Sequence, residues 1–159
     1  MSTLTITPAL DETDVETART LLLEYAASLE VDLAYQDFQR EVASLPGDYA
    51  PPRGCLLLAR NGTSALACVG VRPLDDAVCE MKRLYVRPEA RGTGLGRQLT
   101  MAAIDFGRVA GYRAMRLDTL PSMTSAQSLY ASLGFRKIAP YRASPVVGNV
   151  FMELALDER

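Results

Sequence analysis

The chain has 159 residues, 48% of them hydrophobic and 23% charged, a balance typical of a soluble globular domain with its own core. Its formal net charge of −2 argues against nucleic acid as a partner, and no apolar stretch is long enough to span a membrane. The chain has no histidine, which excludes Ser-His-Asp and Cys-His catalysis and histidine-ligated metals. Acid–base chemistry therefore has to use carboxylates, tyrosine, cysteine, lysine or water.

The three cysteines, Cys55, Cys68 and Cys79, indicate neither a disulfide framework nor a zinc site, because their number is odd and no Cys-x-x-Cys pair occurs. The first ten residues lack the basic start and apolar run of a signal peptide. We expect a single domain over residues 1–159, located in a reducing cytoplasm and without a metal.

The first third of the chain predicts one strand and two helices. Residues 4–8 alternate apolar and polar side chains, as a half-buried strand does. Thr13 and Glu16 fit a capping box, and apolar residues at helical spacing continue from there to position 29. A shorter helix follows, with Phe38 on its apolar face, and Pro46 and the next glycine end it.

Three antiparallel strands are predicted next. Residues 55–59 and 65–71 are apolar, and the Asn61-Gly62 pair between them is a strong hairpin signal. A turn at two aspartates then leads into a third strand over residues 77–86. This meander excludes a doubly wound parallel sheet for the first half of the chain.

The second half predicts a parallel crossover. A glycine-rich loop over residues 91–96 opens a helix that runs to position 109, and residues 114–120 form a strand. Thr124 or Ser125 is expected to cap a last helix, followed by strands over residues 135–138 and 150–156. The fold class is therefore α/β with a mixed sheet, about seven mostly antiparallel strands and about four helices on both faces.

The glycine-rich loop over residues 91–96, RGTGLG, lies between a predicted strand and helix. Successive backbone N–H groups and the helix dipole suit an anion such as pyrophosphate there, and the arginines at positions 91 and 97 add positive charge. A Rossmann loop needs GxGxxG and a second βαβ half, and a Walker A loop needs a Lys-Ser/Thr pair, so neither fits. A glycine-rich turn that only caps the helix is the structural alternative.

Two stretches resemble the GNAT superfamily of acetyltransferases. Residues 79–96, CEMKRLYVRPEARGTGLG, resemble that family's main acetyl-CoA motif, and residues 126–135, AQSLYASLGF, resemble its Ala-x-x-Leu-Tyr-x-x-x-Gly-Phe segment. The two matches follow in the family's order, about 30 residues apart. Met123 stands where the family often has an asparagine, so Ser125 or backbone groups are expected to replace that contact.

The resemblance implies a GNAT fold, whose sheet has a splayed parallel central pair, and acetyl transfer from acetyl-CoA to a primary amine by direct attack. The glycine loop and the strand before it would hold the cofactor, the strand chiefly through backbone groups. The expected cofactor-binding residues are Leu84, Tyr85, Val86, Arg91, Gly92, Thr93, Gly94, Leu95, Gly96, Arg97 and Ser125.

Tyr130 and Glu80 are the predicted catalytic residues. Tyr130 matches the family's tyrosine, and a phenol is able to protonate the departing thiolate; an aromatic core residue is the alternative. Glu80 is the predicted general base, directly or through water, with an ion pair to a nearby lysine or arginine as the alternative. Strand alternation places Glu80 on one face with Lys82, Leu84 and Val86, unless a bulge shifts the phase.

The acceptor is expected to be a small-molecule amine, amino-acid-like rather than a protein surface, with neither nucleic acid nor membrane as a partner and a homodimer by analogy with the family. Tyr35, Phe38, Tyr141 and Asn149 are the candidates for acceptor binding; helix packing or a surface turn is the alternative for them. The rival function is a non-catalytic acyl-CoA-binding or sensing module, or an interaction subunit. The presence of both predicted catalytic residues favours the enzyme.

Overall fold

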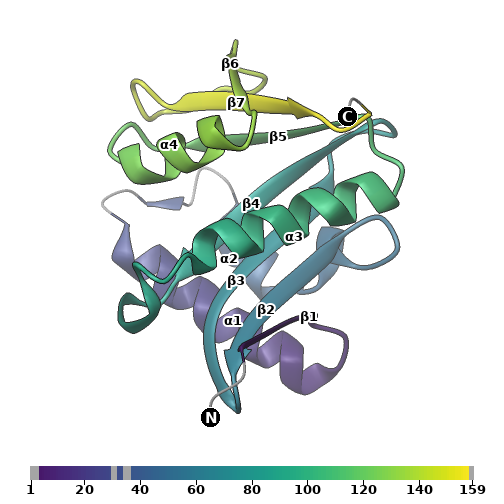
Figure 1. Cartoon of the computed structure of the whole chain (residues 1–159), viewed down its shortest axis with the longest axis vertical. Coiled ribbons are helices and arrows are strands. Elements are labelled where there is room, and N and C mark those ends of the chain that lie inside the picture. Colours follow the sequence, from purple (N-terminus) through teal and green to yellow (C-terminus); the bar gives the residue numbers. More distant parts are fainter. Residues whose placement is uncertain (1–3, 30–31, 34–36, 158–159) are drawn as a thin grey trace.

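The computed structural model describes residues 4–29, 32–33 and 37–157 and contains one seven-stranded sheet (Figure 1). The order across the sheet is β1-β2-β3-β4-β5-β7-β6, and only β4 and β5 run parallel. The predicted mixed sheet with one parallel central pair is therefore confirmed. The strands are β1 (Leu4–Pro8), β2 (Cys55–Asn61), β3 (Ser64–Pro73), β4 (Val78–Val86), β5 (Ala114–Thr119), β6 (Arg136–Ile138) and β7 (Val150–Ala155).

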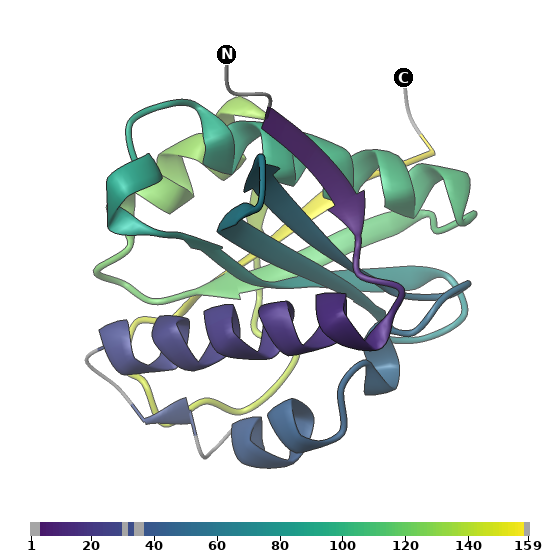
Figure 2. The ribbon, with the colours of Figure 1, turned by 90° about the horizontal axis from the view of Figure 1, so that it is seen from below.

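Helices cover both faces of the sheet (Figure 2). They are α1 (Glu12–Ser28), α2 (Phe38–Ala43), α3 (Leu95–Val109) and α4 (Thr124–Ser132), with short 3-10 turns η2 (Gly47–Tyr49) and η3 (Pro88–Ala90). The α1 and α2 side has its own apolar core, and the α3 and α4 side has another. Alternate side chains of the central strands supply both cores, because successive residues of a strand point to opposite faces.

Two predicted helix caps are wrong. Asp11, not Thr13, caps α1, since its side chain accepts a 2.8 Å hydrogen bond from the backbone N–H of Asp14. Met123 precedes α4, and neither Thr124 nor Ser125 caps that helix. An aspartate two residues upstream was an equally good cap by residue type, and only the chain's path decided between them.

The parallel pair separates soon after it forms. β4 and β5 are paired only from Val78 to Glu80 on one strand and from Ala114 to Arg116 on the other. Beyond these residues the two strands diverge, as Figure 1 shows. The β5-facing edge of the second half of β4 therefore has no strand beside it among the described residues. Backbone groups along that edge are left to bind something other than a strand.

Candidate active site

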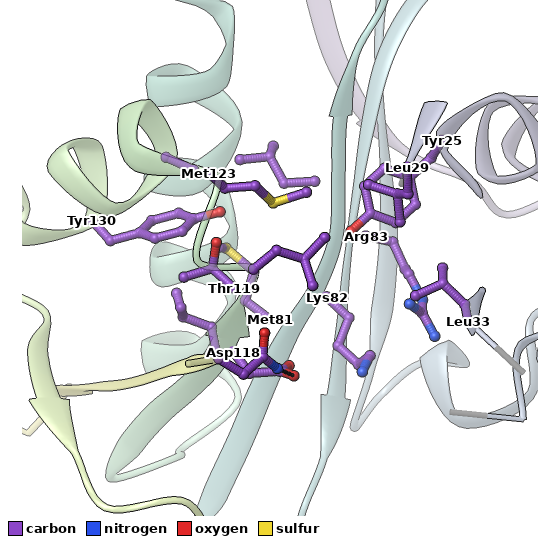
Figure 3. A pocket seen from close by; sticks show the side chains of 15 residues that line it. Tyr25, Leu29, Leu33, Met81, Lys82, Arg83, Asp118, Thr119, Met123 and Tyr130 are labelled. Atoms are coloured by element: carbon purple, nitrogen blue, oxygen red, sulfur yellow. Dashed lines mark hydrogen bonds between the residues drawn. The ribbon is translucent and has the colours of Figure 1, made fainter. Parts of the chain in front are cut away.

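A cavity of about 90 Å³ lies where β4 and β5 separate (Figure 3). Both helical layers contribute to its wall, so it joins the two faces of the sheet through the opening between the strands. Its lining residues are Tyr25, Leu29, Leu33, Met81, Lys82, Arg83, Leu84, Leu117, Asp118, Thr119, Leu120, Met123, Ala126, Tyr130 and Asn149.

A bulge in β4 changes which side chains face this cavity. Arg83 and Leu84 together stand opposite the single Val69 of β3, and Arg83 has a left-handed backbone with φ of 64°. Before the bulge Met81 packs in the α3 core, whereas after it Leu84 packs against that same core. The prediction that Leu84 and Val86 share a face with Glu80 is therefore wrong, and the stated alternative of a bulge holds, because the extra residue reverses the alternation.

An ion pair holds the bulge in place. The guanidinium of Arg83 donates two hydrogen bonds to Glu41 of α2, at 2.9 and 3.0 Å, and lies 5.0 Å from the centre of the Phe38 ring. Both Arg83 and Phe38 are buried. A residue other than glycine in the left-handed conformation costs about 1–3 kcal/mol, and these contacts of Arg83 offset that cost. Phe38, predicted to touch the acceptor, instead supports Arg83.

The glycine loop has the geometry of an anion cradle. Gly92 and Gly94 have φ of 79° and 82°, and a Cβ at either position would meet no atom within 4 Å, so the space above the loop is open. Gly94 precedes α3, and no side chain caps that helix, which leaves its first N–H groups available. Arg97 lies at the same end and donates to Ser132.

The loop is stabilised by its own side chains. Arg91 donates to the backbone carbonyl of Val86 at 2.9 Å, and Thr93 donates to that of Ala90 at 2.6 Å. The side chains of Arg91 and Thr93, two of the predicted cofactor-binding residues, thus stabilise the conformation of the loop. Leu95 is buried in the α3 core, and the Tyr85 side chain points to the α1 side, so only their backbone groups are available to a cofactor.

Tyr130 extends from α4 into the cavity, as Figure 3 shows. Its ring packs against Phe135, with 5.8 Å between the ring centres. Burial, followed by the electrostatic effects of Tyr25 and then Asp118, raises the pKa of the hydroxyl above its ordinary value. Tyr130 is therefore a neutral phenol at neutral pH, in the protonation state that an acid requires.

Glu80 lies behind the cavity and is completely buried. One carboxylate oxygen accepts a hydrogen bond from Arg72 at 3.0 Å. The other accepts a hydrogen bond from the Tyr141 hydroxyl at 2.5 Å and forms an ion pair with Arg142 at 2.6 Å. Burial alone would raise the pKa of Glu80, but the charges of Lys82, Arg142 and Arg72 outweigh it and keep the pKa below its ordinary value. These contacts match the ion-pair alternative, with arginines as the partners.

Glu80 thereby fixes the long connection between β6 and β7. Tyr141 and Arg142 both belong to this connection, which runs along the α1 side of the sheet (Figure 2). Arg142 also lies 3.5 Å from Asp118, and Asn149 donates to Asp118 at 3.1 Å. The β6–β7 connection therefore contacts both strands of the splayed pair, Glu80 on β4 and Asp118 on β5. Asn149 of this connection lines the cavity.

Sequence reasoning missed Asp118, Thr119 and, as a cavity residue, Lys82. Figure 3 shows Lys82 on β4 and Asp118 on β5 pointing into the opening between the strands. Burial lowers the pKa of Lys82 to about 8, although Glu80 and Asp118 attract its charge. The hydroxyl of buried Thr119 has no hydrogen-bond partner in the described structure. Polar residues at the carboxyl end of a crossover strand were a usable signal for this site.

Two further predicted site residues do not line the cavity in the described structure. Ser125 is exposed in the first turn of α4, and Tyr141 lies against Glu80 rather than on the cavity wall. Tyr35 lies outside the described residues. Within residues 4–29, 32–33 and 37–157 no cluster of three potential metal ligands occurs, and no helix is long and apolar enough to cross a membrane.

Comparison with known proteins adds a family assignment to this geometry. Residues 17–135 match the acetyltransferase (GNAT) family. An uncharacterized N-acetyltransferase of Schizosaccharomyces pombe is 40% identical over 91% of this chain and 90% of its own length. N-acetylaspartate synthetase of Danio rerio is 30% identical over 72% of this chain and 42% of its own length.

Solved structures share the fold. An acetyltransferase from Streptococcus agalactiae superposes with a TM-score of 0.78 at 19% identity, covering 96% of this chain and 98% of its own. The structure of yncA from Salmonella typhimurium with its cofactor acetyl-CoA gives a TM-score of 0.72 at 22% identity, covering 99% and 96% of the two chains. At these identities the likeness supports the fold alone.

Proposed function

This chain belongs to the GNAT family of acetyltransferases and is an acetyl-CoA-dependent N-acetyltransferase, and we propose that its acceptor is a small, amino-acid-like molecule with a primary amine. One relative bears the name N-acetylaspartate synthetase, which refers to an acetylated amino acid.

A pair of opposite charges on the cavity wall is the observation on which this proposal rests. Lys82 and Asp118 face the opening between β4 and β5, on the α1 side of the sheet. An amino acid has an ammonium and a carboxylate a few bonds apart, so it is able to match both charges at once. The cavity is small, at about 90 Å³, which also favours a small acceptor over a folded protein surface.

The glycine loop and the free edge of β4 fit the cofactor. The pyrophosphate would be held by the N–H groups at the start of α3, over Gly92 and Gly94, where no Cβ blocks the approach. The pantetheine would run along the unpaired edge of β4 after Glu80. Acetyl-CoA, when bound there, supplies an acetyl thioester to the acceptor amine.

Tyr130 is proposed as the general acid. Its hydroxyl is protonated at neutral pH and lines the cavity from α4, on the side of the sheet where α3 and the glycine loop also lie. A phenol in this position is able to give its proton to the sulfur that departs from the acetyl group. Glu80 as the general base stays a prediction, and its contacts with Arg72, Arg142 and Tyr141 favour a structural role.

A thiol-release assay with acetyl-CoA tests the proposed function. The panel contains L-alanine, L-aspartate, spermidine, a short peptide and ethylamine. Ethylamine is alanine without its carboxylate, so this pair isolates the contribution of the acid group. We expect turnover with at least one amino acid and a clear preference for alanine over ethylamine. Turnover only with spermidine or the peptide contradicts an amino-acid-like acceptor, and silence on the whole panel favours a non-catalytic acyl-CoA-binding module.

A further inference from the structure

We propose that Asp118, and not Glu80, accepts the proton that the acceptor's ammonium loses before it attacks. The inference rests on the proposed function, because it concerns the base of the same transfer reaction. Its basis is the contrast between two carboxylates of neighbouring strands: Glu80, in the paired part of β4, is enclosed by arginines and a tyrosine, whereas Asp118 of β5 lines the cavity.

The two carboxylates differ in how much of their hydrogen-bonding capacity is already used. A carboxylate has about four lone-pair sites. Glu80 receives contacts at 3.0 Å or less from Arg72, Tyr141 and Arg142 on both oxygens and is not among the cavity-lining residues. An acceptor's ammonium could reach it only after those partners moved.

Asp118 has capacity left and is held in a fixed orientation. Its Oδ2 accepts one hydrogen bond, from Asn149 at 3.1 Å, and its Oδ1 lies 3.5 Å from Arg142, too far for a strong hydrogen bond. The side chain is 8% exposed and lines the cavity. Asn149 and Arg142 therefore orient the carboxylate without saturating it, which is the arrangement a base needs.

The position of Asp118 relative to Tyr130, the proposed general acid, also agrees with its role as the base. Residues of β5 alternate, so Leu117 and Thr119 face the α3 and α4 side while Asp118 faces the α1 side, where Lys82 lies. The negative charge of Asp118 contributes to the raised pKa of Tyr130, so the two groups interact across the opening between the strands. The base and the acid are thus on opposite faces of the sheet at the same opening.

With Asp118 as the base and Tyr130 as the acid, the protons and bonds of the transfer reaction balance. Asp118 takes one proton from the acceptor's ammonium, and the neutral nitrogen then attacks the acetyl carbon. The nitrogen–carbon bond forms, the carbon–sulfur bond breaks, and Tyr130 gives its proton to the sulfur. The nitrogen releases its second proton to water, and Asp118 and Tyr130 return to their starting states by exchange with water, so one proton is released per turnover.

Asp118→Asn tests the assignment, since asparagine keeps the shape and removes the basic oxygen. The matched control is Glu153→Gln, which removes a carboxylate of the next strand that pairs with Arg116 at 2.7 Å outside the cavity. Rates are measured with the best acceptor of the thiol-release panel, and acetyl-CoA affinity is measured by calorimetry. We expect kcat to fall about 10²–10⁴-fold in Asp118→Asn, with the acetyl-CoA Kd and the control unchanged.

The pH dependence separates a base from a residue that only binds the acceptor. Raising the pH from about 7 toward about 10 supplies neutral amine from solution, so the kcat ratio of wild type to Asp118→Asn should shrink over that range. Glu80, Lys82, Tyr130, Tyr141 and Arg142 surround Asp118 in both proteins. Lys82 has a pKa of about 8 and is attracted by the charge of Asp118, so its titration enters the ratio, and the same ratio measured in a Lys82→Met background removes that contribution.

Three outcomes overturn the base assignment alone. One is an active wild type with an unchanged kcat in Asp118→Asn, which leaves the proposed function intact. Another is a raised KM at unchanged kcat, which makes Asp118 a binding residue. The third is a kcat ratio that stays constant with pH. A wild type without turnover on any panel amine overturns the proposed function, and the base assignment with it.

Discussion

The proposed cofactor site, called the cofactor side, and the proposed acceptor wall of the cavity, called the acceptor side, are built from different parts of the chain. The cofactor side is one continuous stretch, from β4 through the glycine loop into α3, and it offers backbone N–H groups. The acceptor side brings side chains together from α2, β3, β4, β5 and the β6–β7 connection, linked through Glu80 and Asp118.

This difference suggests a division of labour. Backbone groups recognise a cofactor shared by a whole family, because they do not change when side chains change. Side chains from five separate segments are free to vary independently, so the acceptor side is where specificity is expected to differ between relatives.

The largest expected effect is that of Tyr130→Phe, which removes the hydroxyl where the two sides meet. We expect kcat to fall about 10²–10⁴-fold, because the departing sulfur loses its proton donor. The acetyl-CoA Kd should stay near the wild-type value, since the ring and its contact with Phe135 remain. Steady-state kinetics and calorimetry measure the two quantities. A large loss of affinity with normal kcat would make Tyr130 a binding residue.

Glu80→Gln tests whether the acceptor side is a stabilising ion-pair network. The variant leaves Arg72 and Arg142 around a neutral amide, and breaking a buried ion pair of this kind costs about 3–5 kcal/mol of unfolding free energy. Chemical unfolding measures that loss. A variant with wild-type stability but no activity would restore Glu80 as the base.

The same variant makes a pH prediction. The pKa of Glu80 is lower in the folded protein than in the unfolded chain, so its ionised form stabilises the fold. That contribution is complete above the unfolded value of about 4.3 and is lost as the pH falls through the folded pKa. The stability difference between wild type and Glu80→Gln should therefore be constant near neutral pH and shrink in acid.

Lys82→Met is expected to stabilise the fold and weaken acceptor binding. Burial lowers the pKa of Lys82 to about 8, so the folded protein at pH 7 keeps a buried ammonium that costs on the order of 3 kcal/mol relative to the unfolded chain. This cost fades as the pH rises through 8 toward the unfolded value of about 10.4. Thermal unfolding at pH 7 and pH 10 measures the difference; a less stable variant at pH 7 would contradict it.

Gly94→Ala has the smallest expected effect and acts on the cofactor side. With φ of 82°, the new methyl group forces a left-handed alanine at a cost of about 1–2 kcal/mol. Rearrangement of the loop should weaken acetyl-CoA binding about tenfold. Gly62→Ala is the matched control, because Gly62 has φ of 62° in open space at the β2–β3 hairpin. An equal loss of affinity in both variants would mean a general effect on stability.

Much of the fold was predictable from local patterns. The bounds of β1 and the end of α3 at Val109 were predicted to the residue, because alternation and helical spacing are local signals. The bulge at Arg83 was not, since it depends on Glu41 and Phe38 from another segment. The cap of α1 was also missed, because Asp11 and Thr13 are both of a capping type, and the predicted cap of α4 was wrong because no side chain caps that helix.

By itself, the sequence determined the order of the strands along the chain, the crossover and the glycine loop. These features follow from hydrophobic periodicity and glycine placement, which act over a few neighbouring residues. It also determined that Tyr130 follows the loop in the order typical of an acetyltransferase. Only the tertiary structure decided that Glu80 would be enclosed by Arg72, Arg142 and Tyr141 while Asp118 faces the cavity. The free energy of a buried charge depends on partners distant in the chain, and that proximity exists only in the folded protein.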